Sequence, residues 1–387
     1  MNVEVAGGDD RSRFYWCIMA RSFMGKTRSF RGLAVLRDLV SDSMAIDMGS
    51  AGTIIAVRGR GVVVDEPSVV AINKVTGELV AVGKEALGMQ GRESREVTVL
   101  APLVDGVVAD FERTSAMLDQ FVRQARSGIS HFSRRAVMSV LSGVTHVEQR
   151  ALLAAAEQAR IGRVYMVEEG LAAALGAGVA LDDERGNAVV DIGGGTTNIA
   201  AVASGTIVHA KAERIGSFDI NLAIVDHIRR HHGLSIGQQS SERLKIELGS
   251  ATVPAELGRM ISVKGRDVQT GSPGAVEITA GELYAIIHPV IHKIMLAVRN
   301  TLSEVPPEVA ADIYDRGIIL TGGGALLYGL EDYIQSETKL VVRTAEDPRL
   351  ASVRGLMQLF DEPLLLRRVT RNEPQSLLAA EADAFGT

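Results

Sequence analysis

Cysteine is almost absent from this chain, which has one among its 387 residues. One cysteine cannot form an internal disulfide, so the composition excludes a disulfide-stapled scaffold and fits a reducing cytosol. Inspection finds no apolar run near the roughly 18 residues of a membrane-spanning helix, and no secretory signal is legible at the N-terminus. The formal net charge of −6 argues against a surface built to bind nucleic acid.

The remaining composition is that of an ordinary globular protein, with 46% hydrophobic and 23% charged residues. The length suffices for two or more domains with their own cores.

Two stretches share one formula: an apolar run, Asp, one apolar residue, Gly, three small residues, Thr and a second apolar run. They span 45–53, with Asp47, and 189–197, with Asp191. The formula predicts a buried strand, a tight glycine hairpin and a partner strand. Glycines let the backbone approach a ligand, and successive N–H groups there bind anions. One such turn is often only a hairpin without a ligand, but two turns with the same spacing predict one nucleotide held from both sides. We expect the two aspartates to hold Mg²⁺ through water molecules, because this ion keeps much of its hydration shell.

A third glycine loop follows the apolar run Ile318–Leu320 and comprises Gly322–Gly324. We expect a buried strand that runs into these glycines and then a helix over about 326–336. Backbone at such a helix start can approach a nucleotide.

Residues 1–43 differ from the rest of the chain. From Arg11 to Arg37 there are seven basic residues and no acidic one, interleaved with aromatic residues. Two interpretations stay open: a segment on an anionic membrane surface, or an extension without structure. Within it, residues 20–27 resemble a P-loop but have Ala20 at the first glycine, so we do not expect them to bind nucleotide.

The loop 128–135 carries Ile129 and Phe132 beside two arginines. It either dips into a membrane or tucks both side chains under the next strand.

Thr145 and Glu148 stand at the spacing of a capping box at a helix start. A glutamate there is also placed to orient a water molecule beside a phosphate, and the sequence leaves both roles open. His231 and His232 suggest a metal site, but no third ligand is evident at a sensible spacing, so we expect surface histidines.

Taken in order, the segments 47–49, 191–197 and 320–324 resemble the phosphate-1, phosphate-2 and adenosine loops of the actin and sugar-kinase ATPase superfamily. Longer strings resemble the MreB family of bacterial actins, and they occupy 65–72, 105–111 and 306–308. The resemblance covers roughly residues 44–360.

The resemblance implies an α/β protein with the actin-like ATPase fold: two related RNase H-like domains that flank a nucleotide cleft, each with a smaller subdomain. The implied organisation is an N-terminal extension 1–43, domain I 44–174, domain II 175–347, a returning helix of domain I 348–362 and a tail 363–387.

MreB-like proteins polymerise with ATP into paired filaments on the inner face of the cytoplasmic membrane, where they direct cell-wall elongation and maintain rod shape. The implied cofactors are ATP and Mg²⁺, with slow hydrolysis coupled to polymerisation. The implied partners are further copies of the chain, the membrane and the wall-elongation machinery, with no nucleic acid, and the implied location is cytoplasmic and peripheral to the membrane.

Matching motifs imply individual roles. Glu148 matches the water-activating glutamate, Asp47 and Asp191 match the metal-side aspartates with Asp191 also catalytic, and Ile129 and Phe132 match a membrane-insertion loop. The residues implied to contact the nucleotide are Ser50, Ala51, Gly52, Thr53, Gly193, Gly194, Gly195, Thr196, Thr197, Glu242, Arg243, Leu244, Lys245, Gly322, Gly323, Gly324 and Ala325.

The departures from the family pattern cluster at the cleft. The first turn has Ser50 and Gly52, and Gly52 replaces an asparagine. Asn198 stands where an acid is usual, Phe218 follows Gly216-Ser217 where Gly-Gly-Asp is usual, and Gly170 and Leu141 each replace a proline. Each lost charge-assisted hydrogen bond costs about 1.5–3 kcal/mol of binding. We therefore expect nucleotide binding with slowed hydrolysis.

Alternatives to a filament-forming ATPase remain. A small-molecule kinase on the same fold needs a substrate pocket and a catalytic Asp in the first domain, and neither is evident. A chaperone-like ATPase needs a substrate-binding domain after the ATPase part. A degenerate paralogue that binds nucleotide with little hydrolysis is the remaining alternative.

Overall fold

The computed structural model describes residues 43–126, 135–180 and 182–371. The predictions for the N-terminal extension, for the P-loop-like stretch 20–27 and for Ile129 and Phe132 fall outside these residues and stay predictions.

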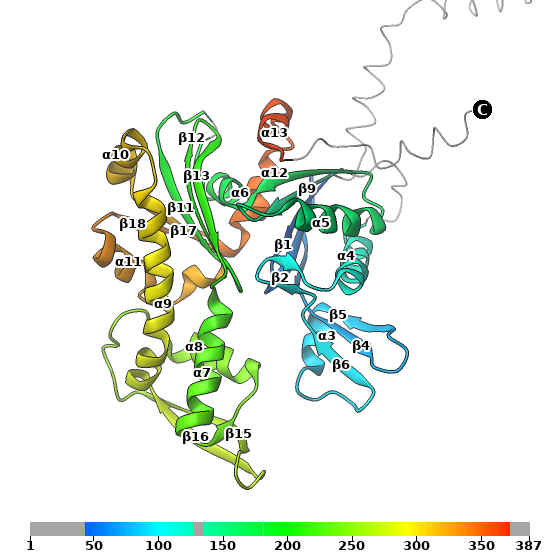
Figure 1. Cartoon of the computed structure of the whole chain (residues 1–387), viewed down its shortest axis with the longest axis vertical. Helices are drawn as coiled ribbons and strands as arrows, with labels where there is room; N and C mark the ends of the chain where they lie inside the picture. The colour runs from blue at the N-terminus through cyan, green and yellow to red at the C-terminus, as the bar shows by residue number, and fades with distance from the viewer. Residues whose placement is uncertain (1–42, 127–134, 181, 372–387) are drawn as a thin grey trace, which may run out of the picture.

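The first large sheet has the strand order β10-β9-β1-β2-β3 (Figure 1). Strands β1 and β2 are antiparallel and form the first predicted hairpin. On the other side of β1, strands β9 and β10 run parallel to it. The strands are β1 (Ser43–Met48), β2 (Gly52–Val57), β3 (Gly61–Pro67), β9 (Arg135–Val140) and β10 (Arg163–Glu168).

The second large sheet has the equivalent order β13-β12-β11-β17-β18, again with an antiparallel hairpin beside parallel strands. All six residues of β11 are buried, as the apolar run predicts. The strands are β11 (Asn187–Ile192), β12 (Thr197–Ala203), β13 (Thr206–Glu213), β17 (Ile318–Thr321) and β18 (Val342–Thr344).

Two helices, α6 (Glu169–Gly176) and α12 (Ala351–Gln358), lie between the two sheets. Their core contains Ala45 and Val137 of the first sheet together with Val189 of the second. The helices approach closely because a Cβ at Gly176 or Gly355 would collide with the backbone of the other helix. The chain therefore returns to the first sheet after the second is complete, and one apolar layer joins both.

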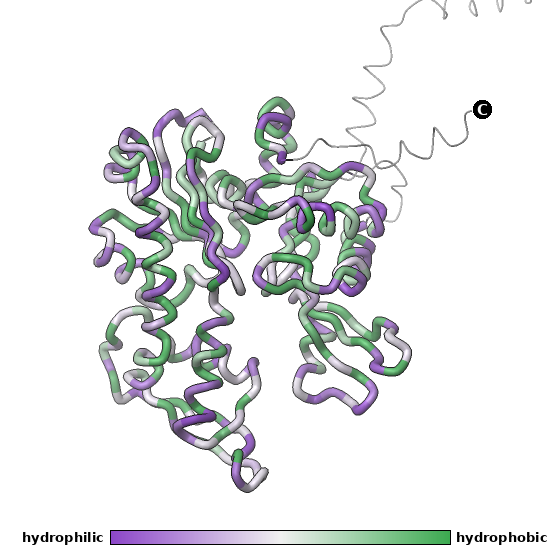
Figure 2. Tube along the Cα trace, in the orientation of Figure 1, coloured by the Kyte–Doolittle hydropathy of each residue, from purple (hydrophilic) through white to green (hydrophobic). Residues whose placement is uncertain are grey.

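Further helices cover the outer faces. In the first half these are α4 (Phe111–Ala125) and α5 (His146–Gln158). In the second half they are α7 (Ser217–His231), α8 (Gln238–Leu248), α9 (Ala280–Ser303), α10 (Pro307–Arg316) and α11 (Leu330–Thr338). Figure 2 shows the hydrophobic residues concentrated along the two sheets and their covering helices.

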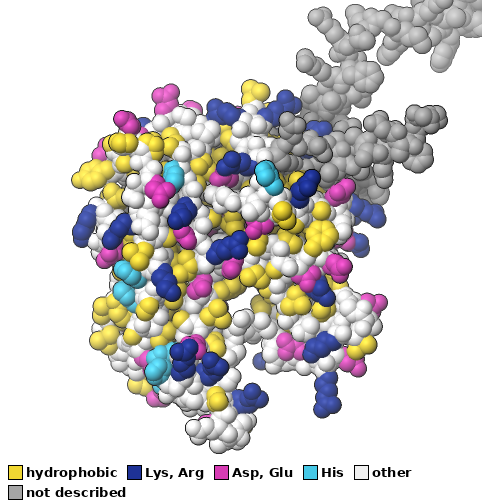
Figure 3. Space-filling model, in the orientation of Figure 1, with side chains coloured by type: hydrophobic (Ala, Val, Ile, Leu, Met, Phe, Trp, Pro, Cys, Tyr) yellow, Lys and Arg dark blue, Asp and Glu magenta, His cyan; other side chains and the backbone are white. Residues whose placement is uncertain are grey.

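Each half also carries a small three-stranded sheet at the same end of the molecule (Figure 1). One comprises β4 (Val70–Asn73), β5 (Leu79–Val82) and β6 (Val97–Leu100), with α3 (Gly83–Met89) beside it. The other comprises β14 (Leu234–Ser235), β15 (Met260–Asp267) and β16 (Pro273–Thr279). Figure 3 shows the surface hollowed between these two parts.

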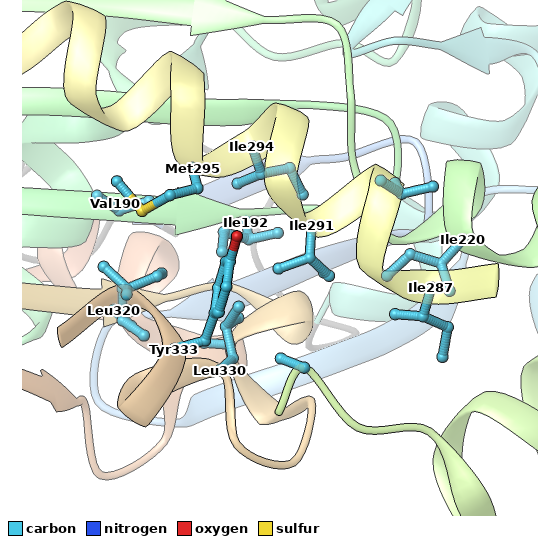
Figure 4. Packing of buried hydrophobic residues seen from close by; sticks show 14 of the residues in the cluster. Val190, Ile192, Ile220, Ile287, Ile291, Ile294, Met295, Leu320, Leu330 and Tyr333 are labelled. Atoms are coloured by element: carbon cyan, nitrogen blue, oxygen red, sulfur yellow. The ribbon is translucent and has the colours of Figure 1, made fainter. Parts of the chain in front are cut away.

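Within the described ranges one helix, α9, is long and apolar enough to cross a membrane by length and composition, which inspection of the sequence missed. Figure 4 shows Ile291 and Ile294 of this helix near Ile192 of the second sheet and Tyr333 of α11, and Ile287 beside Ile220 of α7. Burying each such side chain stabilises the fold by roughly 1.5–3 kcal/mol. The apolar character of α9 is therefore explained by its place in the core.

Two expectations need correction. The glycines after β17 do not open the helix expected over 326–336: a 3-10 turn occupies Gly323–Leu326, and α11 begins only at Leu330. Gly322, at positive φ, lies between β17 and the 3-10 turn, and Gly329, in the left-handed conformation, lies between that turn and α11. The segment after Pro363, which had no assigned structure, forms α13 (Pro363–Val369).

Candidate nucleotide and magnesium site

The two predicted Asp-Gly turns lie against each other. A Cβ at Gly194 would lie 2.7 Å from Cβ of Ala51, and one at Gly195 would lie 3.0 Å from Oδ1 of Asp105. Residues 143 and 90 positions apart in the chain thus meet at one place, as a shared ligand site requires. Only glycine fits there without pushing the two turns apart.

The first turn is held by hydroxyl groups. Ser68 Oγ donates to the carbonyl of Gly49 at 2.6 Å, and Thr53 Oγ1 lies 2.9 Å from Ser68 Oγ. Ser50 Oγ accepts from the N–H of Gly106 at 2.8 Å, which leaves its own proton free to donate to a phosphate oxygen. Thr53 is fully buried, so its hydroxyl fixes the turn.

The second turn is held by the start of α7. The N–H groups of Ser217 and Phe218 donate to the carbonyls of Gly193 and Gly194 at 3.0 and 2.7 Å. Thr197 Oγ1 donates to the carbonyl of Ile215 at 2.8 Å and is likewise buried. The Phe218 ring lies against this turn, 3.1 Å from where a Cβ of Gly194 would stand. An aromatic edge therefore occupies the position where the family pattern has an acid.

Three carboxylates lie behind the turns: Asp47 at the end of β1, Asp191 at the end of β11 and Glu169 at the start of α6. Asp191 is buried, and Asp47 and Glu169 are half-buried. Burial raises the pKa of Asp47, and it raises the pKa of Asp191 to about 7, where the charge of Asp47 adds to the effect. Burial, together with the charges of Asp191 and Asp47, also raises the pKa of Glu169 well above its usual range. Three acids in mutual repulsion are suited to a cation.

Each carboxylate has one short hydrogen bond. Ser139 Oγ donates to Asp47 at 2.6 Å, Thr321 Oγ1 donates to Asp191 at 2.8 Å, and Asn198 Nδ2 donates to Glu169 at 2.7 Å. The amide oxygen of Asn198 is buried with no partner among the described residues.

Carboxylate and amide oxygens held in this way are ligands that suit Mg²⁺, which is bound by a few carboxylates and retained water. The donor set therefore fits the predicted ion. Glu169 was missed from the sequence, although the doublet Glu168-Glu169 before a small-residue helix was visible there.

Polar residues of α7 and α8 form a second part of the site. Lys245 Nζ donates to Glu242 at 2.8 Å and to the carbonyl of Ser217 at 3.2 Å. Asn221, which the sequence did not indicate, donates to the same Glu242 oxygen at 2.5 Å. Burial lowers the pKa of Lys245, opposed by Glu242. Glu242 and Lys245 thus lie together on one face of α8, and their contact with a nucleotide stays a prediction.

Two other predicted nucleotide contacts of α8 point elsewhere. Leu244 is fully buried in the core of the second half, and Arg243 is exposed with its guanidinium 3.9 Å from Glu247. Their side chains are not part of the polar group formed by Glu242 and Lys245.

The third glycine loop lies on the end of β11. The N–H of Gly322 donates to the carbonyl of Pro348 at 2.8 Å, and a Cβ at Gly322 would stand 2.8 Å from Oδ1 of Asp191. Gly324 packs on the side chain of Ile192. The parallel pairing of β11 with β17 produces this contact, so the second and third loops share one sheet edge.

Glu148 performs the predicted capping role. Thr145 caps α5, and its backbone N–H and hydroxyl both donate to Oε2 of Glu148 at 2.8 Å. Oε1 of Glu148 accepts a hydrogen bond of 3.1 Å from Arg214, which belongs to the second half of the chain. Hydrogen bonds from Thr145 lower the pKa of Glu148, with a smaller contribution from Arg214, so the group is ionised at neutral pH. A role in orienting water stays a prediction.

The expectation that no third ligand accompanies the adjacent histidines is wrong. His232 lies beside His227 and Glu282, far from the site described above, and His231 stacks on His227.

Comparison with known proteins decides the family. The MreB/Mbl protein family matches residues 41–367. The chain belongs to the MreB/Mbl family.

Its relatives are close to full-length matches. Cell shape-determining protein MreB of Escherichia coli strain K12 is 39% identical over 328 residues, which is 84% of this chain and 94% of the relative. Cell shape-determining protein Mbl of Bacillus subtilis strain 168 is 40% identical over 306 residues, 79% of this chain and 91% of the relative.

Solved structures agree on the fold. MreB5 of Spiroplasma citri bound to AMPPNP superposes with a TM-score of 0.79 at 31% identity, covering 84% of this chain and 97% of that one. A MamK double helical filament, at 20% identity and a TM-score of 0.69, shares the fold. This MreB/Mbl protein therefore has the actin-like ATPase fold of a cell-shape protein family, as predicted.

Proposed function

We propose that this MreB/Mbl protein binds ATP and Mg²⁺ between its two halves, polymerises into paired filaments and lies on the inner face of the cytoplasmic membrane. There it directs cell-wall elongation together with the elongation machinery, and so maintains rod shape. The proposal rests on one observation above all: two Asp-Gly turns from separate sheets meet over three carboxylates whose pKa values are raised. Bound AMPPNP and ADP in the Spiroplasma citri MreB5 structures support it.

The residues of the site have distinct proposed roles. The Ser50 hydroxyl and the glycine backbone of both turns hold the phosphates, while Asp47 and Asp191 hold the ion and Glu169 adds negative charge behind them. Bound Mg²⁺ neutralises phosphate charge and withdraws electrons from the phosphorus. Glu148, fixed by Thr145 and Arg214, orients the attacking water as an ionised acceptor.

The test is sedimentation of untagged full-length chain with ATP, Mg²⁺ and vesicles that contain anionic lipid. The proposal expects pelleting that needs ATP, and it expects vesicles to pellet with the protein. In an Ile129→Ser, Phe132→Ser variant, the protein is expected to pellet with ATP while the vesicles stay in the supernatant. Protein that binds ATP but stays in the supernatant at every concentration excludes the filament. Turnover stimulated by a sugar would instead identify a small-molecule kinase.

A second candidate is a paralogue that binds nucleotide with little hydrolysis. The aromatic ring of Phe218 against Gly194 and the neutral Asn198 beside Glu169 favour it, because both replace acids usual in the family near the phosphates. Phosphate release measured alongside nucleotide affinity separates the two. Tight binding with no release above the buffer rate supports the paralogue.

A further inference from the structure

Three potential metal ligands meet at the far end of α7. Nε2 of His227 lies 2.9 Å from Oε1 of Glu282, and Nε2 of His232 lies 2.5 Å from the same oxygen. The three ligand atoms all lie within 4.8 Å of one another. The side chains are 27%, 26% and 25% exposed respectively, so the group is both partly desolvated and open to ions.

The backbone holds these ligands from two packed helices. His232 follows the last residue of α7 as its C-cap, and its N–H donates to the carbonyl of Ile228 at 3.0 Å. Glu282 lies in the first turn of α9, where its N–H is capped by Thr279 at 3.1 Å. Ile228 is part of the core that joins the two helices. Ligands placed on packed helices are more precisely positioned than ligands on loops.

A neighbouring ring lies against one ligand. His231 stacks on His227 with ring centroids 4.3 Å apart and an interplanar angle of 25°. His231 itself lies outside the ligand group, so it supplies a matched control.

We propose that His227, His232 and Glu282 bind a divalent transition-metal ion of the zinc class, with water in the fourth position. Two imidazoles and one carboxylate with an open position form a known catalytic zinc donor set, as in thermolysin and carboxypeptidase A. With zinc–ligand bonds of about 2.0–2.1 Å, tetrahedral geometry sets neighbouring ligand atoms about 3.3 Å apart. The present hydrogen-bonded distances of 2.5 and 2.9 Å need to lengthen by less than about 1 Å.

The ligand chemistry also selects among ions. Imidazole nitrogen favours Zn²⁺, Co²⁺, Ni²⁺ and Cu²⁺ over Mg²⁺, which prefers oxygen ligands. The site is therefore distinct from the carboxylate group at the nucleotide turns, both in place and in the ion it takes.

The experiment uses untagged full-length protein freed of metal by a chelator. Calorimetric titration with Zn²⁺ is expected to give one tight site per chain. Titration with Co²⁺ is expected to give the strong visible absorption of a four-coordinate ion. His227→Gln, His232→Gln and Glu282→Gln are each expected to lower Zn²⁺ affinity at least about 10-fold. His231→Gln, next to the ligands, and His292→Gln, on α9, are expected to stay within about 2-fold.

Two further measurements keep the test decisive. Zn²⁺ is expected to raise the melting temperature of the wild type and of the two controls, but not of the ligand variants, since binding to the folded state alone stabilises it. If a ligand variant does not fold, the Co²⁺ spectrum of the wild type still decides. The proposal is overturned if the wild type does not bind Zn²⁺ stoichiometrically. It is also overturned if a variant that combines His227→Gln, His232→Gln and Glu282→Gln binds Zn²⁺ with the affinity of the wild type.

Discussion

Asn198 Nδ2 donates a 2.7 Å hydrogen bond to Oε2 of Glu169, a half-buried carboxylate whose pKa is raised by desolvation and by the charges of Asp191 and Asp47. The amide stands where the family pattern has an acid. A fourth carboxylate at this buried position would face Glu169 directly and repel it. The neutral residue therefore reduces the repulsion in this group when no cation is bound.

The first prediction replaces this amide. Asn198→Asp is expected to lower the free energy of unfolding by about 2–3 kcal/mol at pH 8 without nucleotide, because it removes a donor and adds a buried charge. Urea denaturation measures the change, and Asn300→Asp on exposed α9 surface serves as the control. Equal stability of the Asn198 and Asn300 variants would contradict the account.

The second prediction concerns pH. The pKa of Asp191 rises from 3.8 unfolded to about 7 folded, mainly through burial, so the folded state binds the proton more tightly. Without Mg²⁺ and nucleotide, Asp191 therefore contributes most to the free energy of unfolding below pH 3.8. This contribution is lost as the pH rises to about 7. Glu169 and Asp47, whose pKa values are also raised, act in the same direction.

Urea denaturation at pH 5.5 and 7.5 measures this loss. Asp191→Asn is expected to stabilise the nucleotide-free protein at pH 7.5, to reduce its pH dependence, and to abolish Mg²⁺-dependent nucleotide binding. Saturating Mg²⁺ and nucleotide should protect the wild type more at pH 7.5 than at pH 5.5. An Asp191→Asn variant with wild-type pH dependence would show that the carboxylate is not the group responsible.

Local patterns predicted the parts of the site that lie within one hairpin. The apolar run, Asp and glycines around Asp47 and Asp191 specify strand and turn through neighbouring residues, and the structure forms both. Glu169 and Asn221 could not be assigned in this way, because their contacts come from elements 21 to 29 residues away. The His227 and Glu282 pair, 55 residues apart, depends on the packing of α7 on α9.

The third prediction concerns Gly194. A Cβ there would meet Ala51 at 2.7 Å and Phe218 at 3.1 Å, so Gly194→Ala must push the two turns apart. We expect at least 10-fold weaker nucleotide binding and a loss of about 1–3 kcal/mol in stability. Nucleotide titration measures the first and urea denaturation the second. Gly88→Ala in α3, where a Cβ meets nothing within 4 Å, is the control. Wild-type affinity in the Gly194 variant would mean that the turns do not hold the ligand.

The last prediction separates the two roles of Glu148. Glutamine can preserve the capping box but cannot act as an ionised acceptor for water, so Glu148→Gln should lower phosphate release about 100-fold and change stability little. Thr145→Ala removes the cap of α5 and should lose about 1 kcal/mol of stability while nucleotide affinity stays constant. Phosphate release and urea denaturation, measured on both variants, separate Glu148→Gln, which loses release at little cost in stability, from Thr145→Ala, which loses stability. If Glu148→Gln releases phosphate at the wild-type rate, Glu148 is a capping residue only, and the water is oriented by another group.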